Sequence, residues 1–297
     1  MRIVTRPDFD GIVCAVLLFE KERITKPVKW VEPHEIQHGM IEIKEGDIMA
    51  NLPYDNRCSM WFDHHYSNTI EKPFSGSFAI APSAAGVVFS YYEGKFKKDF
   101  TELVRETDKI DSAQLSIDEV LHPENYPYIL LSMTISNREL SDESYWNSLV
   151  HLLKDFDINT VMNDADIKKK CEKVIENNKA YKTVLLQNTV LKKHVAITDL
   201  RSFDDAPEGN RFLVYSLFPE ANVSVKIRYN DSKKDKMAVS VGHNIFNTTC
   251  KVNAGKMLKK FGGGGHSGAG ACRFPSEKAD EYIAEIISIL LRNEAND

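Results

Sequence analysis

Two short clusters of acids and histidines near the start of the chain have the residue types of a metal-dependent hydrolytic site. The first is RPDFDG, in which Asp8 and Asp10 alternate directly after a short apolar run. The second is MWFDHH, in which Asp63, His64 and His65 follow an apolar run in the same way. Carboxylate oxygens together with imidazole nitrogens are ligands that suit Mn²⁺ or Mg²⁺. Both clusters therefore predict a divalent-cation site.

Two more acids stand further along the chain, Asp47 at the start of an apolar run and Asp111 in the helix-plus-turn segment TDKIDSAQL. A lone aspartate commonly caps a helix or lies on the surface, and this simpler interpretation applies to Asp8, Asp47 and Asp111 taken singly. However, parallel strands end at one edge of a sheet, where open α/β folds bind ligands. Acids from separate elements can converge there, and a shared carboxylate can bridge two ions about 3.5 to 4 Å apart.

The elements that must position these residues alternate between strand and helix. An apolar helix is expected at 11–21, and short apolar runs typical of buried strands stand at 2–5, 28–31, 47–52 and 59–62. This alternation predicts an α/β fold with a parallel sheet. Helical patterns continue to about residue 188.

The last third of the chain has another pattern, with strands, short helices and a strand pair around the polar turn NDSKKD. It predicts a smaller α+β domain. Because 297 residues exceed the size at which one core usually keeps growing, we expect two domains, at 1–187 and 188–297.

The charge balance limits the partners that the chain can have. It carries 38 lysines and arginines against 43 aspartates and glutamates, a net charge of −5, which disfavours extensive contact with long nucleic acids. Residues 200–297 carry a net +2, so the acidic excess lies before them. No apolar stretch approaches the roughly 18 residues of a membrane span, and the N-terminus lacks a signal-peptide pattern. We expect a cytoplasmic protein with no membrane partner.

A glycine-rich segment, FGGGGHSGAG at 261–270, predicts a second site. Consecutive glycines let backbone N–H groups approach an anion closely, although a flexible turn is the simpler explanation. The candidate substrate-binding residues in this segment are Gly263, Gly264, Gly265 and His266. Further candidates are Gly242 and His243 in VGHNIFN, and Arg138 in ISNREL, with a strand-end turn and a surface ion pair as the respective alternatives.

These motifs carry a resemblance. RPDFDG, Asp47, the DHH triplet at 63–65 and Asp111 resemble, in order, the four motifs of the DHH phosphoesterase superfamily. FGGGGHSGAG is similar to the signature of the associated DHHA1 substrate-binding domain. Together the motifs span nearly the whole chain, and the layout resembles the branch of nano-RNases and 3′,5′-bisphosphate nucleotidases, which is related to exopolyphosphatases.

The resemblance implies a catalytic DHH domain, a DHHA1 domain and an active site in the cleft between them. It implies a centre of two Mn²⁺ ions, with Mg²⁺ as the alternative, held by Asp8, Asp10, Asp47, His64 and Asp111. Asp47 would bridge the ions, and it is favoured over Asp55, which lies in a proline-containing loop. Asp111 is favoured over Asp108 because a turn-forming pair follows it. Asp63 and His65 would be catalytic, with His65 facing the substrate phosphate or orienting the metal shell.

The chain departs from the family pattern at one position. Many members have a histidine about three residues before the proline of the first motif, where this chain has Val4, followed by Thr5. One metal position therefore lacks its usual imidazole. A water molecule, or His34 or His38 from a nearby segment, would have to replace it.

The implied activity is hydrolysis of a phosphoester by a metal-activated water molecule. A short single-stranded oligonucleotide or a nucleoside bisphosphate fits the modest charge better than a long polymer. Polyphosphate is the alternative substrate. A protein that senses a nucleotide or a metal without turnover is the alternative of a different functional class. The sequence leaves open whether the protein forms a homodimer.

Overall fold

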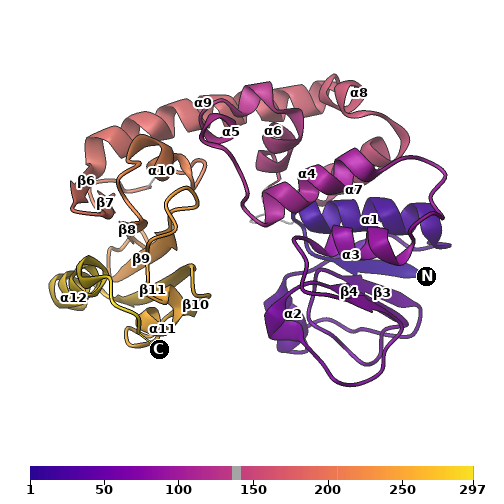
Figure 1. The fold of residues 1–297 in the computed structure, drawn as a ribbon, viewed down its shortest axis with the longest axis horizontal. Coiled ribbons are helices and arrows are strands. Elements are labelled where there is room, and N and C mark those ends of the chain that lie inside the picture. The colour runs from indigo at the N-terminus through magenta and orange to yellow at the C-terminus, as the bar shows by residue number, and fades with distance from the viewer. Residues whose placement is uncertain (136–141, 206, 297) are drawn as a thin grey trace. The chain divides into compact units, whose positions relative to one another are not determined.

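The computed structural model describes residues 1–135, 142–205 and 207–296 (Figure 1). The chain divides into two compact units, the first made of Met1–Leu115 with Pro123–Glu172, the second of Ser116–His122 with Lys173–Asp297. The boundary between the units falls inside the long helix α9 (Ala165–Asn188), which belongs to both. The domain limits of 1–187 and 188–297 stay a prediction.

The first unit is built on a five-stranded parallel sheet, which confirms the expected α/β class. Its strands lie in the order β2-β1-β3-β4-β5, with bounds β1 (Arg2–Thr5), β2 (Lys29–Trp30), β3 (Asp47–Ala50), β4 (Met60–Asp63) and β5 (Gly76–Phe78). β1 and β3 are almost wholly buried, as their apolar sequences require. Because the strands are parallel, their carboxyl ends lie at one edge and their amino ends at the other.

The helix after β1 is the most buried helix of this unit. In α1 (Phe9–Lys21) every residue from Phe9 to Leu18 is buried. Gly11 allows its first turn to lie against the chain that leaves β1, because an added Cβ would stand 2.0 Å from the Arg6 carbonyl oxygen. The other helices of this unit are α2 (Pro33–Gln37), α3 (Ala84–Tyr91), α4 (Thr101–Asp111), α6 (Pro127–Met133), α7 (Glu143–Asp155) and α8 (Ile158–Met162). α1 packs against α3, α4 and α7, and these contacts fix the positions of the three helices.

The second unit contains a six-stranded sheet in the order β10-β11-β9-β8-β7-β6. Its strands are β6 (Thr189–Lys192), β7 (Val195–Asp199), β8 (Val223–Tyr229), β9 (Lys236–His243), β10 (Gly264–Gly265) and β11 (Ala269–Pro275). β8 and β9 form the antiparallel pair that the sequence predicts around NDSKKD. The helices are α5 (Ile117–Leu121), α10 (Leu213–Leu217), α11 (Ala254–Lys259) and α12 (Ala279–Arg292).

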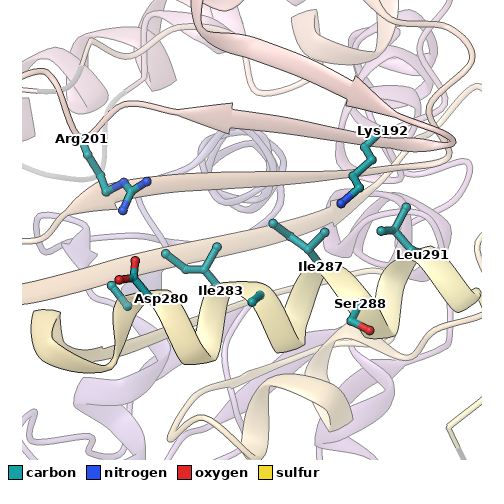
Figure 2. Close-up of a pocket in the computed structure, with 9 residues that line it drawn as sticks. Lys192, Arg201, Asp280, Ile283, Ile287, Ser288 and Leu291 are labelled. Carbon is teal, nitrogen blue, oxygen red and sulfur yellow. The ribbon is translucent and has the colours of Figure 1, made fainter.

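A pocket of about 450 Å³ lies between α12 and the outer strands of this sheet (Figure 2). Ile283, Ile287 and Leu291 line it from the helix, while Lys192 and Arg201 point toward it from the strand side. It contains one acid, Asp280, and no histidine, so it does not have the donor set of a metal site. Across the described ranges, none of the helices has the length and apolar character that a membrane crossing requires.

Candidate metal centre

Asp10 is a buried acid at the carboxyl edge of the parallel sheet. It lies in the first turn of α1 and is 1% exposed. Its Oδ2 accepts a hydrogen bond from the backbone N–H of Ala84 at 3.0 Å, and its Oδ1 accepts one from Ala85 at 2.8 Å. These donors open α3, where the helix dipole also favours negative charge. Asp10 is therefore oriented by backbone groups of a separate element.

His64 follows β4 at the same edge, and its ring nitrogen Nε2 faces the carboxylates of Asp10 and Asp111. Its Nδ1–H donates to the Ala81 carbonyl oxygen at 2.9 Å, which leaves Nε2 as the unprotonated atom of the neutral ring. Burial lowers the pKa of His64 and so favours this neutral form. Nε2 stands 3.4 Å from Asp111 Oδ2 and 3.8 Å from Asp10 Oδ2. It is buried and has no hydrogen-bond partner in the described part of the chain.

Three electron-pair donors thus face one another, since ligand atoms of Asp10, His64 and Asp111 all lie within 4.8 Å of each other. Burial raises the pKa of Asp10 well above its ordinary range, and the carboxylates of Asp111 and Asp8 raise it further. A divalent cation would offset both the burial and the repulsion. Two carboxylates and one imidazole are a donor set that fits Mn²⁺. The residues present therefore fit the metal that the family resemblance implies.

Asp63 and His65 form a hydrogen-bonded pair beside this cluster. Asp63, which is fully buried, accepts from His65 Nδ1 at 2.8 Å and from Asn68 Nδ2 at 2.6 Å. The hydrogen bond to Asp63 raises the pKa of His65, which favours the cationic ring. The His65 side chain is 34% exposed, so it can reach a bound anion. Asp63 thus positions His65, and of these two catalytic candidates only His65 is exposed enough to contact a substrate.

Asp8 lies at the same edge but has partners of its own. It caps α1, where its Oδ1 accepts the Gly11 N–H at 2.9 Å. The same oxygen accepts from Asn51 Nδ2 at 2.9 Å, and Oδ2 forms an ion pair with Arg6 Nη1 at 3.2 Å. Burial raises the pKa of Asp8, with Arg6 acting in the opposite direction. Asp8 therefore caps α1 and also lies at the candidate site, because the first turn of α1 is part of that site.

Asn51 is a residue of this edge that the sequence analysis missed. It directly follows β3, is 2% exposed and has a left-handed backbone with φ of +56°. Its Oδ1 is buried and has no hydrogen-bond partner among the described residues. The signal was available, because Asn51 is a polar residue near the carboxyl end of the apolar run at 47–52.

Asp47 requires a correction. It opens β3 and pairs in register with Arg2 at the start of β1, so it lies at the amino edge of the sheet. Arg2 Nε donates to Asp47 Oδ1 at 2.8 Å, and Nη2 donates to Oδ2 at 2.6 Å. The strand separates Asp47 from the edge that carries Asp10 and His64. The predicted bridging role of Asp47 is therefore replaced by a structural ion pair.

The alternatives weighed from the sequence lie apart from the donor group. Asp108, one turn before Asp111 on α4, accepts from Ser83 Oγ at 2.6 Å and so supports the residue that caps α3. Asp55 pairs with Arg57 in its own loop. The described ranges contain two groups of three possible metal ligands, one of Asp10, His64 and Asp111 and one of Asp63, His64 and His65. His34 and His38 belong to neither group. Arg138 lies outside the described residues.

The glycine-rich segment of the second unit forms a tight hairpin. Gly264 and Gly265 pair with Ala271 and Gly270 of β11. An added Cβ at Gly263 would lie 2.3 Å from the Ala271 carbonyl oxygen, and one at Gly265 would lie 2.2 Å from that of Ala269. Close packing alone thus requires these two glycines.

The remaining candidates of this unit differ in how open they are. Around Gly264 an added Cβ would meet no atom within 4 Å, and His266 is exposed. An added Cβ at Gly242 would stand 2.7 Å from the Tyr215 hydroxyl, so packing explains this glycine. His243 donates from Nε2 to the Val252 carbonyl oxygen at 2.9 Å. Gly264 and His266 are therefore the open positions for a ligand.

Comparisons with known proteins give the family. No protein-family model and no curated protein matches the chain. Among solved structures, the pGpG-specific phosphodiesterase PggH from Vibrio cholerae is 31% identical over 99% of both chains, with a TM-score of 0.87.

Two further structures share the fold at lower identity. An exopolyphosphatase-related protein from Bacteroides fragilis is 15% identical, covering 96% of this chain and 90% of its own, with a TM-score of 0.52. RecJ from Thermus thermophilus, in complex with Mn²⁺, is 12% identical over 98% of this chain and 52% of its own, with a TM-score of 0.56. Because the likeness to PggH extends over the whole chain, this protein belongs to the DHH phosphoesterase family of hydrolases.

Proposed function

We propose that the protein is a divalent-metal-dependent phosphodiesterase that cleaves short linear oligonucleotides, with 5′-phosphorylated dinucleotides as preferred substrates. The observation that carries the metal dependence is the buried Nε2 of His64, which faces the carboxylates of Asp10 and Asp111. The dinucleotide preference is supported by the full-length likeness to a pGpG-specific enzyme.

The metal would be held by Asp10, His64 and Asp111. When bound, a divalent ion supplies charge stabilisation to the phosphate and lowers the pKa of a coordinated water molecule. A ligand set of one nitrogen and two oxygens suits Mn²⁺ better than it suits Mg²⁺, because Mg²⁺ prefers oxygen ligands alone. The N–H groups of Ala84 and Ala85 hold the Asp10 carboxylate in place for this role.

His65 would contact the scissile phosphate. Its Nδ1 is occupied by Asp63, so Nε2 remains to donate a hydrogen bond to a phosphate oxygen. The same Nε2 proton could pass to the departing oxygen of the nucleoside, since the pKa of His65 is raised by Asp63. Asp63 contributes by fixing the ring and its tautomer.

The second unit would bind the rest of the nucleotide. Gly264 has open space where a side chain would stand, and the exposed His266 follows shortly after it along the chain. Backbone N–H groups without a side chain in the way suit a terminal phosphate. His243, Gly242, Gly263, Gly265 and Arg138 stay predicted substrate-binding residues.

A side-by-side hydrolysis assay tests this function. Purified protein with Mn²⁺ is incubated with pGpG, a short RNA, pAp and polyphosphate, with Asp10→Asn as the control. We expect mononucleotides from pGpG at the highest rate. Turnover of polyphosphate alone would replace the proposal with phosphoanhydride hydrolysis, and tight pGpG binding without products would replace it with a sensor. The expected cytoplasmic location stays a prediction that cell fractionation would check, and light scattering would decide between a monomer and a homodimer.

A further inference from the structure

We propose that this centre binds one divalent ion, through Asp10, His64 and Asp111, and that the Arg6 guanidinium takes the place of a second ion beside Asp8. The inference rests on the proposed metal dependence and concerns how many ions serve it. It departs from the two-ion centre that the family resemblance implies, and it follows from three features of the carboxyl edge.

The first feature is the residue at the end of the central strand. β3 lies between β1 and β4, so the residue that follows it stands between the acids of α1 and the histidines after β4. That residue is Asn51, whose Nδ2 donates to Asp8 at 2.9 Å. An amide is neutral and offers a single oxygen, so it cannot bridge two cations as a carboxylate does. Asp47, the expected bridge, lies at the other edge.

The second feature is the commitment of Asp8. Its two oxygens take hydrogen bonds from Gly11 N–H and Asn51 Nδ2 and an ion pair from Arg6. Arg6 is itself shared with Glu32, whose Oε2 stands 3.3 Å from Nε. Asp8 is absent from both groups of three possible ligands in the described ranges. Both oxygens of Asp8 are thus already engaged by protein groups, one of which is a guanidinium.

The third feature is the lack of an imidazole at the end of β1. Val4 is buried in the apolar core, and Thr5 is fully buried with its hydroxyl directed at the Gly11 carbonyl oxygen at 3.4 Å. His38, one of the possible replacements, directs its Nδ1 at the His34 carbonyl oxygen at 2.7 Å within the α2 segment. A second ion would therefore lack its usual nitrogen ligand from β1, and neither His34 nor His38 belongs to a group of possible metal ligands in the described ranges.

Mn²⁺ binding to the full-length protein tests this inference. Calorimetry gives the number of ions per chain, and the electron paramagnetic resonance spectrum distinguishes an isolated Mn²⁺ ion from a coupled pair. We expect one ion per chain and the spectrum of an isolated ion. Two ions with a coupled spectrum would overturn the inference and leave the proposed function intact. No binding would overturn the proposed metal dependence as well.

A matched pair of variants assigns the ligands. Asp10→Asn should weaken Mn²⁺ binding by more than the about 10- to 100-fold that loss of an outer-shell partner costs. The double variant Arg6→Gln/Asp8→Asn removes one charge of each sign and keeps a side chain able to cap α1. It should still bind one ion, with affinity within about tenfold of the parent protein. Loss of the ion in this double variant, with circular dichroism showing an intact fold, would overturn the inference.

Discussion

Two buried aspartates of the same sheet, Asp10 and Asp47, show how position decides between chemistry and structure. Each is 1% exposed, so burial does not distinguish them. Asp47 lies at the amino edge and is neutralised by a bidentate contact with Arg2. Asp10 lies at the carboxyl edge beside Asp111 and His64, where repulsion and burial raise its pKa. A buried acid with a cationic partner stabilises the fold, whereas one that faces other electron-pair donors is suited to bind a metal ion.

The largest expected effect is that of Asp10→Asn on turnover. We expect kcat with pGpG to fall by at least about 1,000-fold. Loss of a metal ligand removes several kcal/mol of transition-state stabilisation, and each increase of about 1.4 kcal/mol in the barrier lowers the rate tenfold. The free energy of unfolding should change by less than about 1 kcal/mol, since relief of carboxylate repulsion offsets a weakened hydrogen bond. Steady-state kinetics and urea denaturation check both statements. Activity near that of the parent protein would remove Asp10 from the site.

Asp47→Asn should show the converse behaviour. Breaking a fully buried ion pair costs about 3 to 5 kcal/mol. Because Arg2 is 18% exposed and an amide still accepts a hydrogen bond, we expect a loss of about 2 kcal/mol in the free energy of unfolding. Activity per folded molecule should be unchanged. Denaturation in urea gives the stability, and a loss of kcat as large as that expected for Asp10→Asn would restore Asp47 to the metal centre.

A smaller effect is expected at the Asp63–His65 pair. Asp63→Asn removes the charge that holds the His65 ring and should lower kcat by about 10- to 100-fold with KM little changed. His65→Gln should lower kcat further, and the double variant should resemble His65→Gln alone, because residues that act as one unit are not additive. A double-variant cycle in steady-state kinetics measures this. Additive losses would show that Asp63 acts independently of His65.

The smallest effect is expected at Asp55, which lies in a loop and pairs with Arg57. That pair holds the pKa of Asp55 below its ordinary value. Its stabilising contribution is therefore present above the ordinary pKa of about 3.9 and is lost as the pH falls through the lowered pKa. Asp55→Asn should change Tm at neutral pH by less than about 2 °C, and this difference should vanish in strong acid, below the lowered pKa. Calorimetric scans at both pH values check it.

The sequence predicts much of this site, because short apolar runs followed by polar residues mark strand ends. Asp10 and His64 are identifiable in this way, and the family resemblance supports Asp111. What the sequence does not supply is strand register. The apolar run at 47–52 has an aspartate at one end and Asn51 near the other, and only pairing with β1 shows which of them reaches the carboxyl edge.

The glycine-rich segment shows a second limit. Its composition indicates an anion site, yet the structure gives Gly263 and Gly265 a packing reason of their own. A glycine required by backbone contact and one required by a ligand have the same sequence signature. Three-dimensional contacts are needed to separate them, and they leave Gly264 as the open position.

The most direct test of the account compares Mn²⁺ affinity in Asp10→Asn and Asp47→Asn by calorimetry, with circular dichroism confirming that both variants are folded. The account predicts that Asp10→Asn loses Mn²⁺ binding and that Asp47→Asn binds Mn²⁺ as the parent protein does. Normal binding by Asp10→Asn, or loss of binding by a folded Asp47→Asn, would contradict it.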